Sequence, residues 1–538
     1  MKLSCPCMCL LSFFLICSCK EEIPVDYLTL DLTEYQAVPA GAAEGPPYAE
    51  TAFLLSLLGE EALRDLGLRM PAADEAAGGG QDAEARTGTG ICIEVFSYWG
   101  GEEPPDGIVI SRVWYVPASD PLERRVETSL DACISGSEVL IPLQTLAPPL
   151  VALKIDGLSA GDERYPLVRT VSCRVRQEIP SPDRGSQGSG GKKIGVGALN
   201  KIRERIAARA AGLEGLLIGA QKNLIEERPR IFWVCSGGDL MLDRGAAGIL
   251  LREGPEGILG ETAAFISQAD LSLVNLEGAV SSRGVKTPKS FNFRFDPKIV
   301  PALKNAGIDA VLLANNHSFD YGETAFLDTL QNLKDGRIGI LGVGLNDDEA
   351  STPFLFENEA GSARCFGIAS FPREWNGWDG LSVAALPDKA GILHARKGGG
   401  EKLKARFSMD DDTLDIVLFH GGVEWSTSPN TSTREFYTDL AQAGADLIIG
   451  SHPHVVQGFE WIAGKPVFWS LGNYVFGGME NTIGGEEGLF VRMGFSGKSL
   501  VYFEPYALRL THTKTSIAPR ENLETFYTRS TELREANY

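Results

Sequence analysis

The chain has 538 residues, a formal net charge of −21 and 43% hydrophobic residues. This length predicts roughly two to four domains, and the hydrophobic content excludes a wholly disordered chain. The acidic excess argues against general binding of nucleic acid, because the summed field of the protein repels phosphate.

Residues 1–19 have the pattern of an export signal. Their short apolar run ends at Ile16 and is too short to cross about 30 Å of hydrocarbon. Ile16 and the three residues after it resemble a bacterial lipobox. By that resemblance Cys19 is lipidated and begins an exported lipoprotein, anchored to a membrane in the periplasm or at the cell surface. The alternatives are Cys17 as the lipidated residue, an ordinary cleaved signal and an uncleaved anchor.

Residues 20–180 predict a smaller N-terminal α+β domain of unassigned role. Strand-like runs dominate from residue 91 onward, and LVRTVSCRVRQEI (167–179) alternates apolar and polar side chains. Two short segments here weakly resemble solute-binding proteins, which leaves a solute-binding module as an alternative role. Glycine- and serine-rich residues 181–195 predict a flexible linker. Residues 196–228 predict a connecting helix.

The cysteines beyond residue 19 are scattered and include no closely spaced pair. This spacing excludes a structural zinc site built from cysteines. Cys235 and Cys365 lie within apolar strand-like runs, so we expect both to be buried and unpaired.

Between residues 229 and 515, apolar strand-like runs alternate with helical stretches. Continuous apolar strands separated by helices predict an α/β domain in which helices cover the faces of the sheets. We expect residues 516–538 to form a C-terminal tail.

Metal-competent side chains recur where these apolar runs end. In α/β folds the carboxyl ends of strands are where ligands gather. Carboxylate, amide oxygen and imidazole suit Zn²⁺, Mn²⁺ or Fe, and a carboxylate can bridge two such ions. Each side chain alone also fits an ordinary turn, cap or core role, but together they predict a site for one or two divalent metal ions. They are Asp239, Glu277, Asn316, His420, His452 and His454.

The same segments resemble the CapA-type poly-gamma-glutamate (capsule) biosynthesis proteins, a branch of the calcineurin-like metallophosphoesterase superfamily. The matching segments occur in the order of that family between residues 230 and about 500. They include GGDLMLDRG (237–245), NLEG (275–278), ANNHSFDYG (314–322) and GSHPHVVQ (450–457). The resemblance implies a metallophosphoesterase-like layered fold.

The resemblance also implies two metal positions. Glu277 would be the bridging carboxylate. Asp239 would be a shared metal ligand. Asn316, His420 and His452 would complete one position, and His454 would join Asp239 and Glu277 at the other. One departure from the superfamily is Met241, which stands where the first motif usually has histidine. A thioether is a poor ligand for a hard divalent ion. One position is therefore short of a ligand, and the number of ions stays open.

A catalytic pair is implied next to the metal positions. His317 would face the substrate, where it stabilises negative charge or protonates the leaving oxygen. Asp320 would fix the tautomer of His317, although a local helix cap is the alternative role for Asp320. Candidate substrate-binding residues are Arg244, Arg294, Glu424 and Asn473.

We therefore expect an exported, metal-dependent hydrolase-like protein that acts in the synthesis or anchoring of an anionic envelope polymer of the poly-gamma-glutamate (capsule) type. Its expected partners are an anionic polymer or phosphoester substrate, the membrane through a lipid anchor, and other envelope biosynthesis proteins. The alternative is a non-catalytic assembly or binding factor for such a polymer on the same fold.

Overall fold

The chain divides into two compact units. The first is built from residues before 230, and the second is built from residues 230–538 together with the segments 118–127 and 145–154. The predicted export signal with Cys19, the linker 181–195 and the helix 196–228 lie outside the described residues. The computed structural model describes residues 27–34, 90–99, 108–125, 127–128, 140–142, 146–162, 168–178, 229–374, 377–479 and 482–536.

The N-terminal part of the chain contains a mixed sheet with the strand order β1-β2-β8-β3-β5, and β6 pairs with β3. β1 is parallel to β2, whereas β8 is antiparallel to both β2 and β3. These strands confirm the β-containing N-terminal region. The bounds are β1 (Tyr27–Glu34), β2 (Gly90–Trp99), β3 (Ile108–Ser119), β5 (Leu140–Pro142), β6 (Val151–Ala152) and β8 (Val168–Glu178), with the small pair β4 (Glu127–Thr128) and β7 (Lys154–Ile155).

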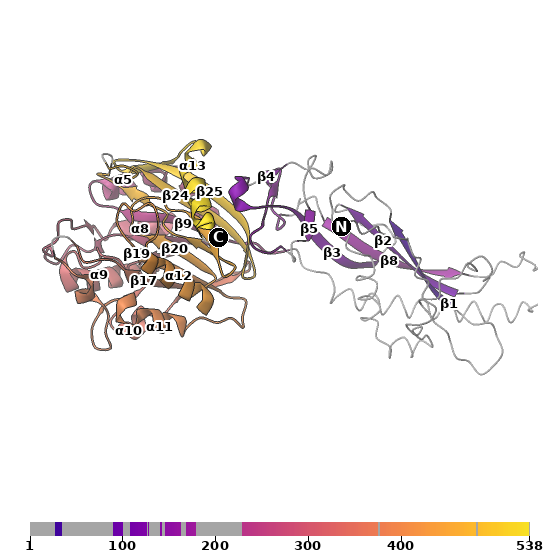
Figure 1. Ribbon diagram of the computed structural model, residues 1–538, viewed down its shortest axis with the longest axis horizontal. Coiled ribbons are helices and arrows are strands. Elements are labelled where there is room, and N and C mark those ends of the chain that lie inside the picture. Colours follow the sequence, from indigo (N-terminus) through magenta and orange to yellow (C-terminus); the bar gives the residue numbers. More distant parts are fainter. Residues whose placement is uncertain are drawn as a thin grey trace, which may run out of the picture. The chain divides into compact units, whose positions relative to one another are not determined.

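The second unit contains two larger sheets (Figure 1). The first has the order β14-β13-β10-β9-β24-β25-β26, and β23 also pairs with β9. β14, β13, β10, β9 and β23 run parallel to one another, and β24, β25 and β26 extend the sheet from β9 with antiparallel pairing. The bounds are β9 (Phe232–Met241), β10 (Leu271–Leu276), β13 (Ala310–Leu312), β14 (Gly339–Leu341), β23 (Asn473–Phe476), β24 (Glu487–Ser496), β25 (Ser499–Thr511) and β26 (Lys514–Ile517).

The other sheet of this unit has the order β16-β17-β19-β20-β22-β21. Its inner strands are parallel, and its two edge strands are antiparallel. The bounds are β16 (Phe354–Glu357), β17 (Ser362–Ser370), β19 (Leu414–Gly421), β20 (Leu447–Ser451), β21 (Phe459–Ile462) and β22 (Lys465–Phe468), with the short pairs β11 (Ala279–Val280) with β12 (Arg294–Phe295) and β15 (Val343–Gly344) with β18 (Gly391–Ile392).

Short helices connect and cover the strands, and in Figure 1 α11 and α12 lie beside β17 and β20. The α-helices are α5 (Ala246–Glu253), α6 (Pro255–Leu259), α7 (Thr262–Gln268), α8 (Ile299–Asn305), α9 (Gly322–Asp335), α10 (Asp347–Ala350), α11 (Gly399–Lys404), α12 (Thr431–Ala443) and α13 (Glu524–Glu535). The 3₁₀ turns are η2 (Pro121–Glu123), η4 (Gly380–Val383), η5 (Ala395–Lys397) and η6 (Arg520–Leu523).

The strands of these sheets have uninterrupted apolar sequences because both of their faces are buried. On β19, Ile416 and Leu418 share a buried cluster with Val234 of the other sheet. Val417 and Phe419 alternate with them and pack into a second cluster, which includes side chains of α11 and α12. The two sheets therefore pack face to face, with helices outside, and the predicted layered α/β fold is confirmed. Cys235 and Cys365 are buried and unpaired, as predicted.

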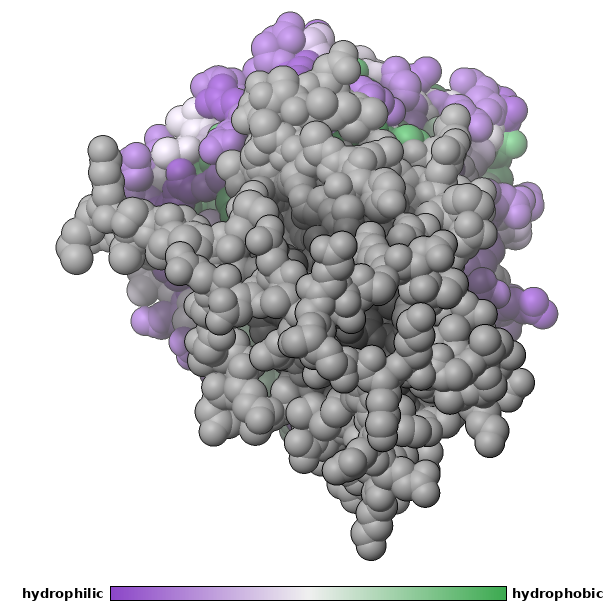
Figure 2. Space-filling model, turned by 90° about the vertical axis from the view of Figure 1, so that its right-hand side faces the viewer, coloured by the Kyte–Doolittle hydropathy of each residue, from purple (hydrophilic) through white to green (hydrophobic). Residues whose placement is uncertain are grey.

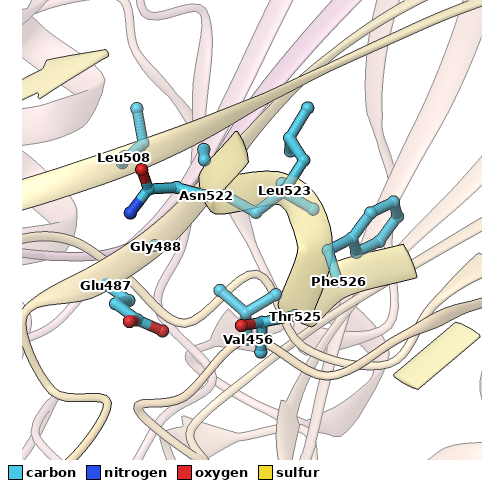
Figure 3. A pocket seen from close by; sticks show the side chains of 10 residues that line it. Val456, Glu487, Gly488, Leu508, Asn522, Leu523, Thr525 and Phe526 are labelled. Atoms are coloured by element: carbon cyan, nitrogen blue, oxygen red, sulfur yellow. The ribbon is translucent and has the colours of Figure 1, made fainter. Parts of the chain in front are cut away.

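The C-terminal residues pack against the loop that follows β20. A cavity of about 20 Å³, large enough for roughly one water molecule, lies between Val456 of that loop and Leu523 and Phe526 near the chain end. Figure 3 shows the side chains that line it. Nearby, the Phe459 N–H donates to Ser530 Oγ on α13 (2.8 Å). Residues 514–535 thus contribute a strand, a turn and a helix to the second unit.

Where described residues are visible in Figure 2, hydrophilic side chains predominate. Within the described part of the chain, no helix combines the length and the apolar character needed to cross a membrane.

Candidate metal centre

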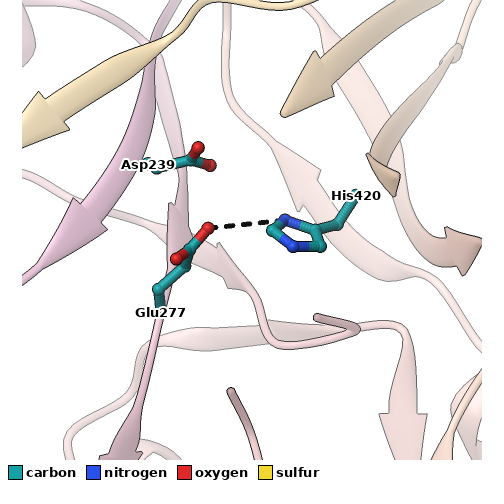
Figure 4. A group of neighbouring side chains, drawn as sticks. All are labelled: Asp239, Glu277 and His420. Atoms are coloured by element: carbon teal, nitrogen blue, oxygen red, sulfur yellow. Dashed lines mark ion pairs between the residues drawn. The ribbon is translucent and has the colours of Figure 1, made fainter. Parts of the chain in front are cut away.

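Parallel strands from both sheets of the second unit end at one place. Asp239 lies on β9, and Glu277 directly follows β10. His420 lies on β19 of the other sheet, one residue before that strand ends. Asp239, Glu277 and His420 are each fully buried, and one ligand atom of each lies within 4.8 Å of the others. Figure 4 shows these three side chains pointing toward one another, with Glu277 Oε1 3.6 Å from His420 Nδ1.

Asn316 and His452 lie on the far side of the His420 ring. His420 Nε2 is 3.0 Å from Asn316 Oδ1 and 3.1 Å from His452 Nδ1. Ligand atoms held at about 2.1 Å from one ion lie roughly 3.0–3.4 Å apart. These three atoms therefore have the spacing of ligands around a single cation.

His454 lies on the other side of the cluster, beside Asp239. His454 Nδ1 is 3.2 Å from Asp239 Oδ2 and 2.9 Å from Asn473 Oδ1. The structure thus brings together the six side chains for which we predicted metal binding. Asn316 and His452 meet Nε2 of His420, Glu277 lies at Nδ1 of the same ring, and His454 lies beside Asp239.

Two polar atoms in this cluster are buried without a hydrogen-bond partner among the described residues. They are Glu277 Oε2 and His452 Nε2. Burying a carboxylate oxygen unpaired is costly, and an ion beside Glu277 Oε2 would satisfy it. His452 Nε2 points away from Nδ1 of the same ring, so an ion held at Nδ1 does not account for it. The chemistry of the donor set, two carboxylates, an amide and three imidazoles, fits a divalent transition metal.

The electrostatics of the cluster fit a cation as well. Burial and the nearby charge of Asp239 raise the pKa of Glu277 well above its ordinary value. Burial and the neighbouring imidazoles lower the pKa of His420, and the same effects lower the pKa of His452 to about 3. Both imidazoles are therefore neutral and keep lone pairs for a metal.

His454 and Asp239 form the charged pair of the cluster. Burial alone would lower the pKa of His454, but its hydrogen bond to Asp239 and the charge of Glu277 raise it to about 10. Burial alone would raise the pKa of Asp239, but its hydrogen bond with His454 outweighs this and lowers it. A proton on His454 thus supplies the positive charge that a metal ion would supply.

Two amides and a hydroxyl orient the ligands, and sequence reasoning gave none of them a role. Asn275 Nδ2 donates to Asp239 Oδ1 (2.8 Å) and Glu277 Oε1 (3.1 Å). Asn315 Nδ2 donates to Asn275 Oδ1 (3.0 Å) and so fixes the orientation of that amide. Ser451 Oγ donates to the carbonyl of Phe419 (3.1 Å) and can accept the Nδ1–H of His420 (3.2 Å).

The predicted pair of His317 and Asp320 is in contact. His317 Nδ1 is 2.7 Å from Asp320 Oδ2, and His317 Nε2 is 4.0 Å from Glu277 Oε2. Asp320 also accepts hydrogen bonds from the Lys289 ammonium (2.9 Å) and the Phe293 N–H (2.7 Å). Because three donors converge on Asp320, it is held as an acceptor and directs the Nδ1–H of His317 away from the cluster.

Lys289 is a buried lysine that sequence reasoning missed. Its side chain is 1% exposed, and its ammonium reaches Asp320, Glu374 (3.2 Å) and the face of Trp378 (4.2 Å from the ring centroid). It lies in an irregular loop, so no strand-end pattern marks it. The loop segment that carries Trp378 is thereby tied to the residues that position His317.

The candidate substrate-binding residues Glu424, Arg244 and Arg294 differ in how they lie relative to the cluster. Glu424 is exposed, and its charge acts on Glu277 and His454, so it lies near the cluster. Arg244 bonds to the carbonyl of Gly477 and packs over Phe293, whose ring contacts His317. The guanidinium of Arg294 instead packs over Tyr321 (4.1 Å) and bonds to the carbonyl of Arg283 (3.1 Å).

Strained backbone gathers around the cluster. Arg244, Trp425, His452 and His454 have φ values of 55°, 64°, 99° and 58°, in the left-handed region that favours glycine. Trp425 is 37% exposed and lies 5.5 Å from the His454 ring. Strain of this kind, typically about 1–3 kcal/mol per residue, persists where the surrounding structure fixes the conformation, and it is common at functional sites.

The fold and this cluster define a layered α/β protein with a buried group of carboxylate and imidazole side chains that could hold a metal ion. Residues 234–478 match the family model described as "Bacterial capsule synthesis protein PGA_cap". The resemblance to the CapA-type proteins is therefore confirmed over this part of the chain.

Three curated relatives have names that refer to PGA, capsule or polyglutamine synthesis. The PGA biosynthesis protein CapA of Bacillus subtilis (strain 168) is 27% identical over 243 residues, which cover 44% of this chain and 62% of that protein. The capsule biosynthesis protein CapA of Bacillus anthracis is 27% identical over 263 residues, covering 44% and 58%. A probable polyglutamine synthesis accessory protein of Mycobacterium tuberculosis is 26% identical over 287 residues, covering 46% and 75%. The chain thus spans about three fifths of the length of the first two relatives.

Solved structures with a similar arrangement are more distant. A structure described as a novel phosphatase from Mycoplasma pneumoniae has a TM-score of 0.34 and 17% identity, covering 56% of this chain and 99% of that chain. A hypothetical protein from Thermus thermophilus has a TM-score of 0.31 and 16% identity, covering 52% and 99%.

Proposed function

We propose that this protein is an exported, membrane-anchored, metal-dependent hydrolase of the CapA type. It would hydrolyse a phosphoester or related bond during the synthesis or anchoring of an anionic envelope polymer. The observation that carries the proposal is the pair of buried ligand groups, Asn316 with His420 and His452, and Asp239 with His454, each with atoms spaced as around one ion. The names of the relatives refer to capsule and PGA synthesis, and they support the assignment to an anionic envelope polymer.

The residues fit one ion in each group. Asn316, His420 and His452 would hold one, Asp239 and His454 would hold the other, and Glu277 would lie between them. A bound ion of this kind neutralises charge on a phosphoryl oxygen and lowers the pKa of a bound water.

His317 is the side chain that would donate a proton and stabilise negative charge during the reaction. Its Nδ1–H is directed to Asp320, so its Nε2 faces the cluster. Burial lowers the pKa of His317, so the imidazole is neutral until negative charge arrives beside it. An anionic substrate favours a proton on Nε2, where it stabilises the developing charge and can pass to the leaving oxygen.

Hydrolysis of bis-p-nitrophenyl phosphate by the purified protein tests this proposal. We expect turnover with Mn²⁺ and none with EDTA. His317→Gln should lower kcat about 10²–10⁴-fold while the metal content, measured by mass spectrometry, stays unchanged. His420→Ala and His452→Ala should lose both metal and turnover. The exposed His512 on the β25–β26 turn is the matched control, and His512→Ala should resemble the wild type.

A non-catalytic factor on the same fold is the second candidate, and Met241 favours it. Met241 Sδ accepts the N–H of Asp243 (3.1 Å), so this thioether is engaged with the backbone. Stoichiometric metal without turnover on phosphodiesters would favour a polymer-binding role. Absence of bound metal from the wild type would contradict both forms of the proposal.

A further inference from the structure

Asn473 points its amide oxygen at the half of the cluster that Met241 leaves short of a ligand. It begins β23, which runs parallel to β9, and it lies opposite Asp239 in the register of these two strands. Its side chain is fully buried. Its Oδ1 is 2.9 Å from His454 Nδ1, which is in turn 3.2 Å from Asp239 Oδ2.

Hydrogen bonds fix which end of this amide faces the cluster. Asn473 Nδ2 donates to the carbonyl oxygens of Gly485 (2.9 Å) and His454 (3.3 Å). An amide nitrogen has two hydrogens and no lone pair to offer, so both donors are used by backbone carbonyls. The oxygen therefore faces His454 and Asp239. Asn275 is oriented the opposite way, because its nitrogen faces the carboxylates.

Met241 occurs two residues after Asp239, on the same face of β9. In this position a histidine would complete a metal site next to Asp239, but the thioether accepts a backbone N–H instead. Asp239 and His454 alone give few protein ligands for an ion. An oxygen from the neighbouring strand β23 is in place to add one.

We infer that Asn473 Oδ1 is a metal ligand that takes the place of the histidine missing at position 241. Resting on the proposed function, this inference specifies the metal position formed by Asp239, His454 and Glu277. The spacing of its ligand atoms, 2.9 and 3.2 Å, matches that of the Asn316 group, 3.0 and 3.1 Å. Each group then combines an asparagine oxygen with imidazole nitrogen, a set that suits Mn²⁺ or Fe²⁺.

Metal content distinguishes a ligand from a residue that only orients His454. The probe is Mn²⁺ alone, added to the apo-protein and counted by mass spectrometry after desalting. We expect two ions in the wild type and in Asn473→Asp, which keeps an oxygen in place, but one ion in Asn473→Leu. The control is Asn522→Leu, a change at an exposed asparagine, and it should retain two ions.

A second variant shows whether a loss of metal in Asn473→Leu comes from the missing ligand or from misfolding. Asn473→Leu combined with Met241→His supplies the usual histidine, and it should bind two ions again. A crystal structure with Mn²⁺ should show anomalous density within about 2.3 Å of Asn473 Oδ1.

Two results overturn the inference while leaving the proposed function intact. One is that Asn473→Leu keeps both ions. The other is an ion that lies more than about 3 Å from Asn473 Oδ1, beyond coordination distance, or that occupies only the Asn316 group. A wild-type protein that binds no Mn²⁺ would instead overturn the proposed function.

Discussion

Asn275 separates two buried carboxylates by donating a hydrogen to each. Asn275→Asp would place a third carboxylate beside Asp239 and Glu277, where the amide nitrogen now lies 2.8 and 3.1 Å from their oxygens. We expect the metal-free variant to lose about 3–5 kcal/mol of unfolding free energy, because a buried charge is left without a partner. Mn²⁺ should restore more stability to the variant than to the wild type.

Urea unfolding with EDTA and with Mn²⁺ checks this prediction. Asn522→Asp, at an exposed asparagine, is the control and should change the unfolding free energy by less than about 0.5 kcal/mol. If Asn275→Asp is as stable as the wild type in EDTA, the hydrogen bonds of Asn275 to the two carboxylates do not contribute to the unfolding free energy.

His394 gives a pH dependence that is separate from the metal centre. Burial lowers the pKa of His394 from 6.5 to about 4. Between these values the unfolded chain binds a proton that the folded chain does not. The stability that neutral His394 contributes is therefore fully present above its pKa in the unfolded chain. About 3 kcal/mol of unfolding free energy is lost as the pH falls toward its pKa in the folded chain.

His394→Asn is the matched variant for this effect. His394 Nδ1 accepts the N–H of Arg396 (3.2 Å) as the cap of η5, and an asparagine oxygen can accept the same bond. The difference in unfolding free energy between wild type and variant should shrink as the pH falls from about 7 to about 4. A difference that is constant over this range would contradict the shifted pKa.

Sequence reasoning found the ligands whose position follows from local pattern. Asp239, Glu277 and His420 each end or directly follow an apolar run, and parallel strands carry such residues to the same edge. Lys289 and Ser451 could not be found in this way. Their roles depend on which hydrogen-bond partners the folded chain brings to them, and no spacing in the sequence encodes those partners.

At the scale of elements, helix α13 supports β21, the strand that directly follows the loop carrying His452 and His454. Ser530 is fully buried, donates to the carbonyl of Phe526 (2.8 Å) and accepts the N–H of Phe459 (2.8 Å). Ser530→Ala leaves that N–H without an acceptor, so we expect a loss of about 1–3 kcal/mol of unfolding free energy.

Ser267 on α7 is the control for this change. It is exposed and donates to the carbonyl of Ala264 (2.9 Å), so Ser267→Ala should cost less than about 0.5 kcal/mol. Chemical denaturation of the three proteins gives the comparison. Equal stabilities of the Ser530→Ala and Ser267→Ala variants would show that α13 does not support β21 through this bond.

The layered architecture was predictable, whereas the place of β23 was not. Apolar strands that alternate with helical stretches indicate sheets covered by helices, and the alternation on β19 shows why. The pairing of β23 with β9 joins Asn473 to Asp239, which are far apart in the chain, and it has no local signal. For this reason Asn473 was predicted to contact substrate, although it lies opposite Asp239.

At the scale of the whole molecule, attachment to a membrane stays a prediction from residues 1–19. We expect metabolic labelling with palmitate to mark the wild type and Cys17→Ser, but not Cys19→Ser. The reason is that acyl chains joined to Cys19 would hold the protein by burying apolar methylene groups, each worth about 0.8 kcal/mol. Label that persists in Cys19→Ser and disappears in Cys17→Ser would move the anchor to Cys17.

The strand pairing of β23 with β9 also has a consequence for the order of events during synthesis. The side chains around the cluster come from positions 239 to 473, and the last of them lies beside the first. A nascent chain that is still missing β23 therefore cannot close the ring of side chains around Asp239. If this position takes up a cation as proposed, uptake with Asn473 as a ligand follows translation of β23, although β24, β25, β26 and α13 are still to be made.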